Sequence, residues 1–138
     1  MILATRYHDI SCGHRVVGHE NKCRFIHGHN YRVTFECYGE LDSIGRVLDF
    51  GVIKALLCEW LEQEWDHRML MWEHDPLLEQ MRGLSPESVV AVPFNPTAEN
   101  MAEYLVKTVG PQQLAGTGVA LARCVVEETR KCAAVYEI

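Results

Sequence analysis

The chain has no excess of basic residues, no long apolar run and no cysteine pair at metal-binding spacing. Its 13 lysines and arginines are outnumbered by 19 aspartates and glutamates, and the net charge of -6 disfavours a nucleic-acid-binding surface. No apolar stretch approaches the ~20 residues that span a bilayer. Residues 1–9 lack the basic and apolar segments of a signal peptide. The six cysteines form no Cys-x-x-Cys pair and no secreted-domain framework. We therefore expect a cytoplasmic protein with reduced cysteines and neither a nucleic-acid nor a membrane partner.

The composition that remains is that of an ordinary globular domain, which we expect to span residues 1–138. Apolar residues make up 48% of the chain and charged residues 23%, which separates it from disordered sequences. A chain of this length can bury a sizeable core. We find no internal repeat, low-complexity segment or linker that would divide it.

The hydrophobic pattern predicts an α+β domain with an antiparallel four-stranded sheet and two helices on one face. Strands are expected at residues 2–9, 29–38, 119–127 and 131–138, with a further short strand at 46–48. Ser11 to His14 are expected to break the first strand because their pattern no longer alternates. The open edges of such a sheet favour self-association.

Two helices are predicted from apolar stripes at helical spacing. The first covers residues 49–65 with Asp49 as its N-cap, and the second starts at Asn95 or Thr97 and is expected to stop at Gly110-Pro111. Residues 71–96, with prolines at positions 76, 86 and 93 inside the segment, are predicted to be a loop, apart from a helical turn near 77–81.

The most informative stretch is Cys23-x-x-x-His27-Gly28-His29, which leads directly into a strand. Side chains two residues apart in an extended chain point to the same face, so two imidazoles about 7 Å apart can share a metal ion. His14 is the nearest upstream candidate for a third ligand. Three histidines leave a tetrahedral position open for water or substrate, which is typical of catalytic zinc. The alternative is that these histidines are polar surface residues and Cys23 is a small buried one.

Two further features suggest proton chemistry. A thiol beside a metal ion or another cation ionises more readily, so Cys23 is a candidate base or nucleophile near neutral pH. If the His67 side chain points into the site, Asp66 could fix its tautomer and raise its basicity.

Taken together, the motifs resemble the 6-pyruvoyltetrahydropterin synthase/6-carboxytetrahydropterin synthase family over nearly the whole chain. In order, they are Cys12-Gly13-His14-Arg15, Cys23-x-x-x-His27-Gly28-His29, Val47-Leu48-Asp49-Phe50, Asp66-His67, Asn95-Pro96-Thr97-Ala98-Glu99 and Glu128-Thr129. The resemblance implies the tunnelling fold (T-fold), in which oligomers, trimers stacked into hexamers, close a barrel.

The resemblance also implies roles for individual residues. The zinc ligands would be His14, His27 and His29. Cys23 matches the catalytic cysteine, and Asp66 with His67 matches the acid–histidine pair that completes a proton relay. Glu128 matches the carboxylate that anchors the guanidine-like edge of a pterin, and Thr97 matches a further contact to the same ring.

Within this family the substrate would be 7,8-dihydroneopterin triphosphate, and zinc would be the cofactor. Three residues separate Cys23 from His27, which is similar to the 6-carboxytetrahydropterin synthases of queuosine biosynthesis. The 6-pyruvoyltetrahydropterin synthases tend to have a longer insert there, and their product is the alternative. A non-catalytic zinc-stabilised pterin-binding module is a further alternative, with His8 or His19 as a fourth ligand. An aldolase-like pterin enzyme is disfavoured because it needs no three-histidine site.

Overall fold

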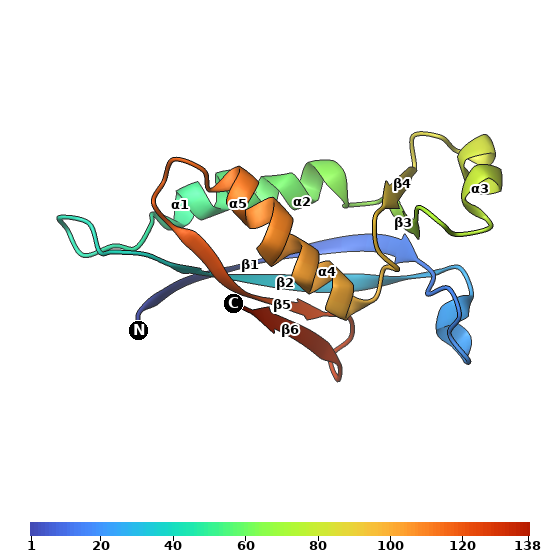
Figure 1. Ribbon diagram of the computed structural model, residues 1–138, viewed down its shortest axis with the longest axis horizontal. Helices are drawn as coiled ribbons and strands as arrows, with labels where there is room; N and C mark the ends of the chain where they lie inside the picture. Colours follow the sequence, from blue (N-terminus) through green and yellow to red (C-terminus); the bar gives the residue numbers. More distant parts are fainter.

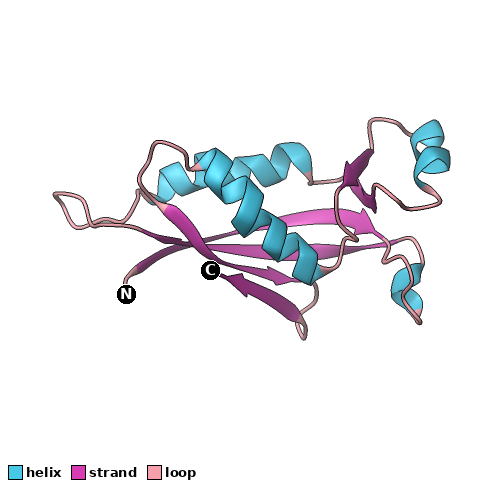
Figure 2. Ribbon diagram, viewed as in Figure 1, coloured by secondary structure: helices cyan, strands magenta, loops and turns pink.

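The computed structural model describes residues 1–138 and shows one twisted sheet with its long helices on one face (Figures 1 and 2). The sheet has six strands in the order β4-β3-β1-β2-β5-β6. Their bounds are β1 Leu3–His14, β2 His27–Tyr38, β3 Met69–Trp72, β4 Val89–Val92, β5 Ala120–Glu127 and β6 Ala133–Glu137. The α+β class and the antiparallel strands β1, β2, β5 and β6 confirm the prediction, whereas the strand count does not.

The two longest strands form a hairpin that is paired over its whole length, from Leu3 opposite Tyr38 to His14 opposite His27. The predicted break at residues 11–14 is wrong. Cys12 and His14 continue the buried alternation of β1 while Ser11 and Gly13 point to the other face. A Cβ atom at Gly13 would lie 2.8 Å from the Met69 sulfur, so glycine lets β3 pair closely against β1.

The first long helix consists of α1 (Phe50–Ile53), a π-helical turn η2 (Lys54–Cys58) and α2 (Glu59–Glu64). Asp49 caps it as predicted, because its carboxylate accepts a hydrogen bond from Gly51 N at 2.7 Å. The expected strand at 46–48 does not form. Arg46 instead folds back onto Asp42 through both its backbone and its side chain, which closes the preceding loop on itself.

The second long helix consists of α4 (Ala98–Tyr104), a π-helical turn η3 (Leu105–Val109) and α5 (Gly110–Gln113). Thr97 caps it by accepting a hydrogen bond from Asn100 N at 3.1 Å. The predicted stop at Gly110-Pro111 is wrong. Gly110 N donates to the carbonyl five residues back, and Pro111 follows where the register changes, so its missing N–H is tolerated.

Residues 71–96 contain more structure than the predicted loop. Strand β3 runs parallel to β1, β4 runs parallel to β3, and α3 (Leu78–Leu84) lies between them, where a helical turn was expected. The core consists of 26 buried residues between the sheet and the two long helices, including Leu57, Leu61 and Trp65 at helical spacing. None of the helices is both long enough and apolar enough to cross a membrane.

Candidate active site

Four potential metal ligands meet where the buried face of the sheet ends. The alternation that buries Tyr31 on β2 also directs His27 and His29 to the helix-covered side, and His14 ends β1 opposite His27. Glu128 follows β5 directly. One ligand atom from each of His14, His27, His29 and Glu128 lies within 4.8 Å of all the others. These four residues could therefore hold a metal ion.

The hydrogen bonds of two imidazoles leave a bare nitrogen on each. His14 Nδ1 lies 2.7 Å from the Pro96 carbonyl, and His27 Nδ1 lies 2.7 Å from the Phe25 carbonyl. Because a carbonyl only accepts, each Nδ1 carries a proton, and in the neutral ring each Nε2 therefore presents a lone pair. The two Nε2 atoms are 3.1 Å apart. In neutral rings two lone pairs that face each other at that distance repel, and a cation between them would remove the repulsion. Donation from the other ring nitrogen to a backbone carbonyl is the arrangement found at metal-bound histidines.

The third imidazole, that of His29, also presents a ring nitrogen that could bind a metal ion. His29 Nε2 is buried and has no hydrogen-bond partner, although Glu128 Oε1 is only 2.9 Å away. Burial lowers the pKa of His29, which favours the neutral ring. Close contacts with His14 and then His29 hold the pKa of Glu128 below its usual value, which favours the carboxylate. Neutral imidazoles and an ionised carboxylate are the forms that bind a cation, so the donor set fits zinc.

Cys23 is the available thiol near the cluster. It lies in the short helix η1 (Lys22–Arg24) between β1 and β2 and is half-buried. Its carbonyl accepts a hydrogen bond from Val16 N at 2.8 Å. The other nearby thiol, Cys12, is buried on β1, and burial raises its pKa to about 12. Cys12 therefore stays protonated at neutral pH, whereas Cys23 can meet solvent and substrate.

The Asp66–His67 pair forms as the sequence suggested. His67 Nδ1 donates to Asp66 Oδ2 at 2.8 Å, while Asp66 Oδ1 accepts from Ser11 N at 2.9 Å. His67 N also donates to the Ser11 carbonyl. Although burial raises the pKa of Asp66, the hydrogen bonds from Ser11 and His67 outweigh that effect and lower it. The carboxylate is thus ionised and orients the imidazole.

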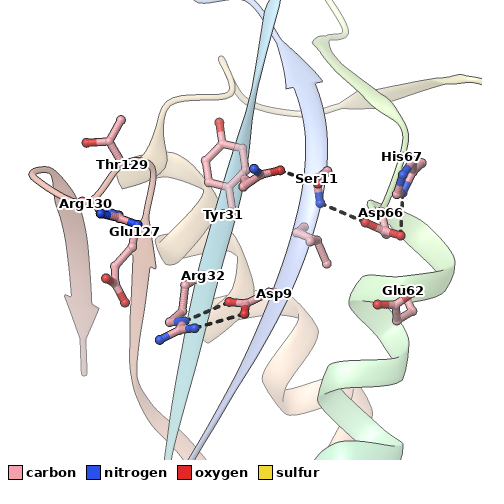
Figure 3. A pocket seen from close by; sticks show the side chains of 12 residues that line it. Asp9, Ser11, Tyr31, Arg32, Glu62, Asp66, His67, Glu127, Thr129 and Arg130 are labelled. Atoms are coloured by element: carbon pink, nitrogen blue, oxygen red, sulfur yellow. Dashed lines mark hydrogen bonds and ion pairs between the residues drawn. The ribbon is translucent and has the colours of Figure 1, made fainter.

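The same pair opens on the other side of the sheet from the imidazole cluster. His67 has a positive φ of 58° and its side chain is 80% exposed. It lines a cavity of about 620 Å³ with Ser11 and Asn30, on the face turned away from α4 (Figure 3). Because side chains alternate along a strand, Ser11 and Asn30 point away from the face of His14 and His29. A second cavity, of about 460 Å³, is lined by both His67 and His29, but His14, His27 and Glu128 do not line it.

Three contacts around the cluster were not singled out from the sequence. The Tyr31 hydroxyl lies 3.2 Å from His14 Nδ1, and its position two residues after His29 on the same strand face was a usable signal. The Pro96 and Phe25 carbonyls could not be found from the sequence, because any residue can supply a backbone oxygen. Thr97 is adjacent to Pro96, and its oxygen already accepts the capping hydrogen bond of α4.

The fold and this site together define an α+β class of protein: a helix-covered sheet whose end carries three converging imidazoles and a carboxylate that could hold a metal ion. A family model described as 6-pyruvoyl tetrahydropterin synthase matches residues 4–138, and the chain belongs to that family. The chain is 32% identical to a 6-carboxy-5,6,7,8-tetrahydropterin synthase of Rickettsia felis, over 96% of this chain and 97% of that protein. It is also 39% identical to a probable 6-carboxy-5,6,7,8-tetrahydropterin synthase of Halobacterium salinarum, over 70% of this chain and 61% of that protein.

Solved structures show the same fold. An uncharacterized protein of Wolinella succinogenes superposes with a TM-score of 0.83 and 25% identity, covering 99% of this chain and 97% of that chain. The 6-pyruvoyl tetrahydropterin synthase of Caenorhabditis elegans has a TM-score of 0.71 and 23% identity, covering 99% and 95%. The T-fold expected from the sequence is thereby confirmed.

Proposed function

We propose that the protein is a zinc-dependent 6-carboxy-5,6,7,8-tetrahydropterin synthase of the 7-deazaguanine (queuosine) pathway. With one water, 7,8-dihydroneopterin triphosphate would give 6-carboxytetrahydropterin, acetaldehyde and triphosphate. The observation that carries this proposal is the set of three imidazoles whose ligand atoms lie within 4.8 Å of one another, with His29 Nε2 buried and without a hydrogen-bond partner. The printed names of the Rickettsia and Halobacterium relatives and the three-residue Cys23–His27 spacing favour the carboxy product over the pyruvoyl one.

In this proposal His14, His27 and His29 hold the zinc ion. When bound, zinc would supply Lewis acidity at the side-chain oxygens of the substrate. The Pro96 and Phe25 carbonyls keep the His14 and His27 rings in the tautomer that leaves Nε2 free for it.

The remaining residues bind the pterin and move protons. Glu128 accepts two parallel N–H bonds from the guanidine-like edge of the pterin, with Thr97 as a further contact. Cys23 as thiolate and His67, oriented by Asp66, transfer protons at the reacting side chain. Because the His67 side chain is 80% exposed and shares no cavity with His14, His27 or Glu128, we propose that the relay is completed by another copy of the chain in a homo-oligomer, a trimer or hexamer.

This arrangement predicts complementation between two inactive variants. Cys23→Ala and His67→Ala would each lose activity, and mixed oligomers refolded from both would regain part of it, because some sites combine an intact Cys23 with an intact His67. Refolding each variant alone is the control. Mixed oligomers that stay as inactive as the parents would show that Cys23 and His67 act from the same chain.

Product mass spectrometry on the zinc-loaded protein with 7,8-dihydroneopterin triphosphate tests the reaction itself. Formation of 6-carboxytetrahydropterin with an equal amount of acetaldehyde is expected. A 6-pyruvoyl product without acetaldehyde would assign the alternative activity, 6-pyruvoyltetrahydropterin synthase, in which only triphosphate is eliminated. Unchanged substrate would overturn both.

A second candidate is a non-catalytic, zinc-stabilised pterin-binding module. It is favoured by Glu128, whose carboxylate lies close enough to fill the fourth tetrahedral position. The fourth ligands suggested from the sequence lie elsewhere: His8 contacts Glu62 at 2.6 Å, and His19 accepts from Asn21 N. Removal of metal distinguishes the candidates, because a structural site would unfold on chelation whereas a catalytic site would lose only turnover.

A further inference from the structure

A buried carboxylate that the proposed reaction does not use lies close to the Cys23 segment. The Asp75 side chain is fully buried, and Asp75 and His14 are the two buried polar residues of the chain. The Arg15 guanidinium forms a bidentate pair with this carboxylate: Nε donates to Oδ2 at 2.7 Å and Nη2 donates to Oδ1 at 2.9 Å. Arg15 is the only cation paired with Asp75, so the buried charge depends on this one side chain.

The same guanidinium also reaches the segment that carries the thiol. Arg15 Nη1 donates to the Arg24 carbonyl at 3.2 Å, while the next backbone amide, Val16 N, donates to the Cys23 carbonyl at 2.8 Å. Two successive carbonyls of η1 are thus held by two successive residues that follow His14. A displacement of Arg15 would therefore move Cys23 relative to the metal ligands.

Asp75 also forms hydrogen bonds within the segment that follows β3. Its Oδ1 also accepts from Leu77 N at 2.8 Å, and its backbone amide donates to the Trp72 carbonyl at the end of β3. Strand β3 in turn pairs with β1 at Gly13 and His14. Figure 1 shows the segments around residues 15–26 and 73–84 at the same end of the molecule.

We propose that Arg15 and Asp75 are positioning residues that fix the Cys23 segment at its working distance from the imidazole cluster. The function of this pair rests on the proposed catalytic role of Cys23, although the pair itself is read from the contacts alone. Three of the five N–H groups of Arg15 bind Asp75 and the Arg24 carbonyl, so we assign Arg15 to positioning and not to binding of the substrate triphosphate. Lys22, which is exposed on η1, is a candidate for binding the triphosphate.

Arg15→Lys is the sharpest test because it keeps a positive charge for Asp75. An ammonium group cannot grip both carboxylate oxygens and the Arg24 carbonyl in the fixed geometry of a guanidinium. Asp75→Asn is the partner variant. Asp42→Asn is the matched control, since Asp42 also binds an arginine Nε, that of Arg46 at 2.9 Å, and accepts backbone N–H groups. Its loop lies at the opposite end of the sheet (Figure 1).

Three readouts are taken: zinc content, the rate of Cys23 alkylation in the folded protein, and kcat with KM. In Arg15→Lys, zinc content is unchanged and Cys23 alkylates at least about threefold faster at pH 9, because the loosened segment opens locally. The kcat falls by about 10- to 100-fold while KM changes by less than about threefold, as expected when a reacting group is misplaced. Asp42→Asn matches the wild type in all three readouts.

Alkylation and kcat that match the wild type in Arg15→Lys would overturn the proposal. A raised KM with unchanged kcat would also overturn it, in favour of triphosphate binding. If Asp75→Asn fails to fold, Arg15→Lys decides alone. If the wild type has no turnover, the proposed function fails, and the alkylation rates still test the clamp.

Discussion

Replacement of His27 by alanine should cost substantial stability only when metal is bound. In the metal-free protein the two Nε2 atoms of His14 and His27 face each other at 3.1 Å, so deletion of one ring relieves a repulsion. The deletion also removes the bond from His27 Nδ1 to the Phe25 carbonyl, worth about 1 kcal/mol. These effects oppose each other, and the metal-free variant should unfold within about 1 kcal/mol of the wild type.

With metal bound, the balance changes. At a free metal concentration 1,000 times its dissociation constant, binding adds about 4 kcal/mol to the free energy of unfolding. Loss of one of three imidazole ligands should weaken binding at least about 100-fold, which removes about 2.7 kcal/mol of that gain. For a domain of this size the difference corresponds to roughly 5–10 °C in Tm.

Calorimetric melting after chelation and after zinc addition measures both states. His74→Ala is the control, because its side chain is 68% exposed and lies outside the cluster. The metal-free wild type should still unfold cooperatively, since the 26-residue core includes none of the four cluster residues. A His27→Ala loss of the same size with and without metal would show that His27 is a packing residue and not a ligand.

Further changes separate the roles of other residues. Cys23→Ala should retain zinc and lose turnover, and wild-type rates would remove the thiol from the mechanism. Alkylation of the folded protein should mark Cys23 and the exposed Cys132 but spare Cys37, whose pKa burial raises to about 11; equal labelling of Cys37 would contradict this. The pKa of Asp66 lies below its ordinary value of 3.8, so its stabilisation is present above that pH and lost below it. Asp66→Asn should therefore cost stability at pH 6 and progressively less below about pH 4, as followed by urea unfolding. Thr97→Ala should lower the free energy of unfolding by about 1 kcal/mol through loss of the cap of α4, and an unchanged urea midpoint would argue against that cap.

The parts of the fold that follow local rules could be predicted from the sequence. Strand alternation placed His27 and His29 on the apolar face, and the caps at Asp49 and Thr97 follow from the side-chain chemistry of helix starts. Strands β3 and β4 could not be found this way, because four-residue apolar runs show neither helical nor strand periodicity. Their pairing is parallel and long-range.

The geometry of the candidate site was only partly predictable. The imidazole set followed from spacing, but the direction in which His67 points depends on its positive φ, which no residue pattern marks. The close approach of Glu128 to His29 depends on β5 pairing with β2, a contact between distant parts of the chain. Arg15 and Asp75 are also far apart in the sequence, and no local pattern around either residue predicts that they pair.

The full-length pairing of β1 with β2 has a consequence for how the protein is made. All three imidazoles lie within the first 29 residues, and closing the β1–β2 connection requires an ordered loop of only 12 residues between His14 and His27. Glu128 reaches them from about a hundred residues further along the chain, and the entropy of closing a loop grows with its length. During synthesis, the nitrogen ligands therefore emerge from the ribosome before either long helix exists. A metal ion captured at that stage would fasten the hairpin on which the rest of the sheet is assembled.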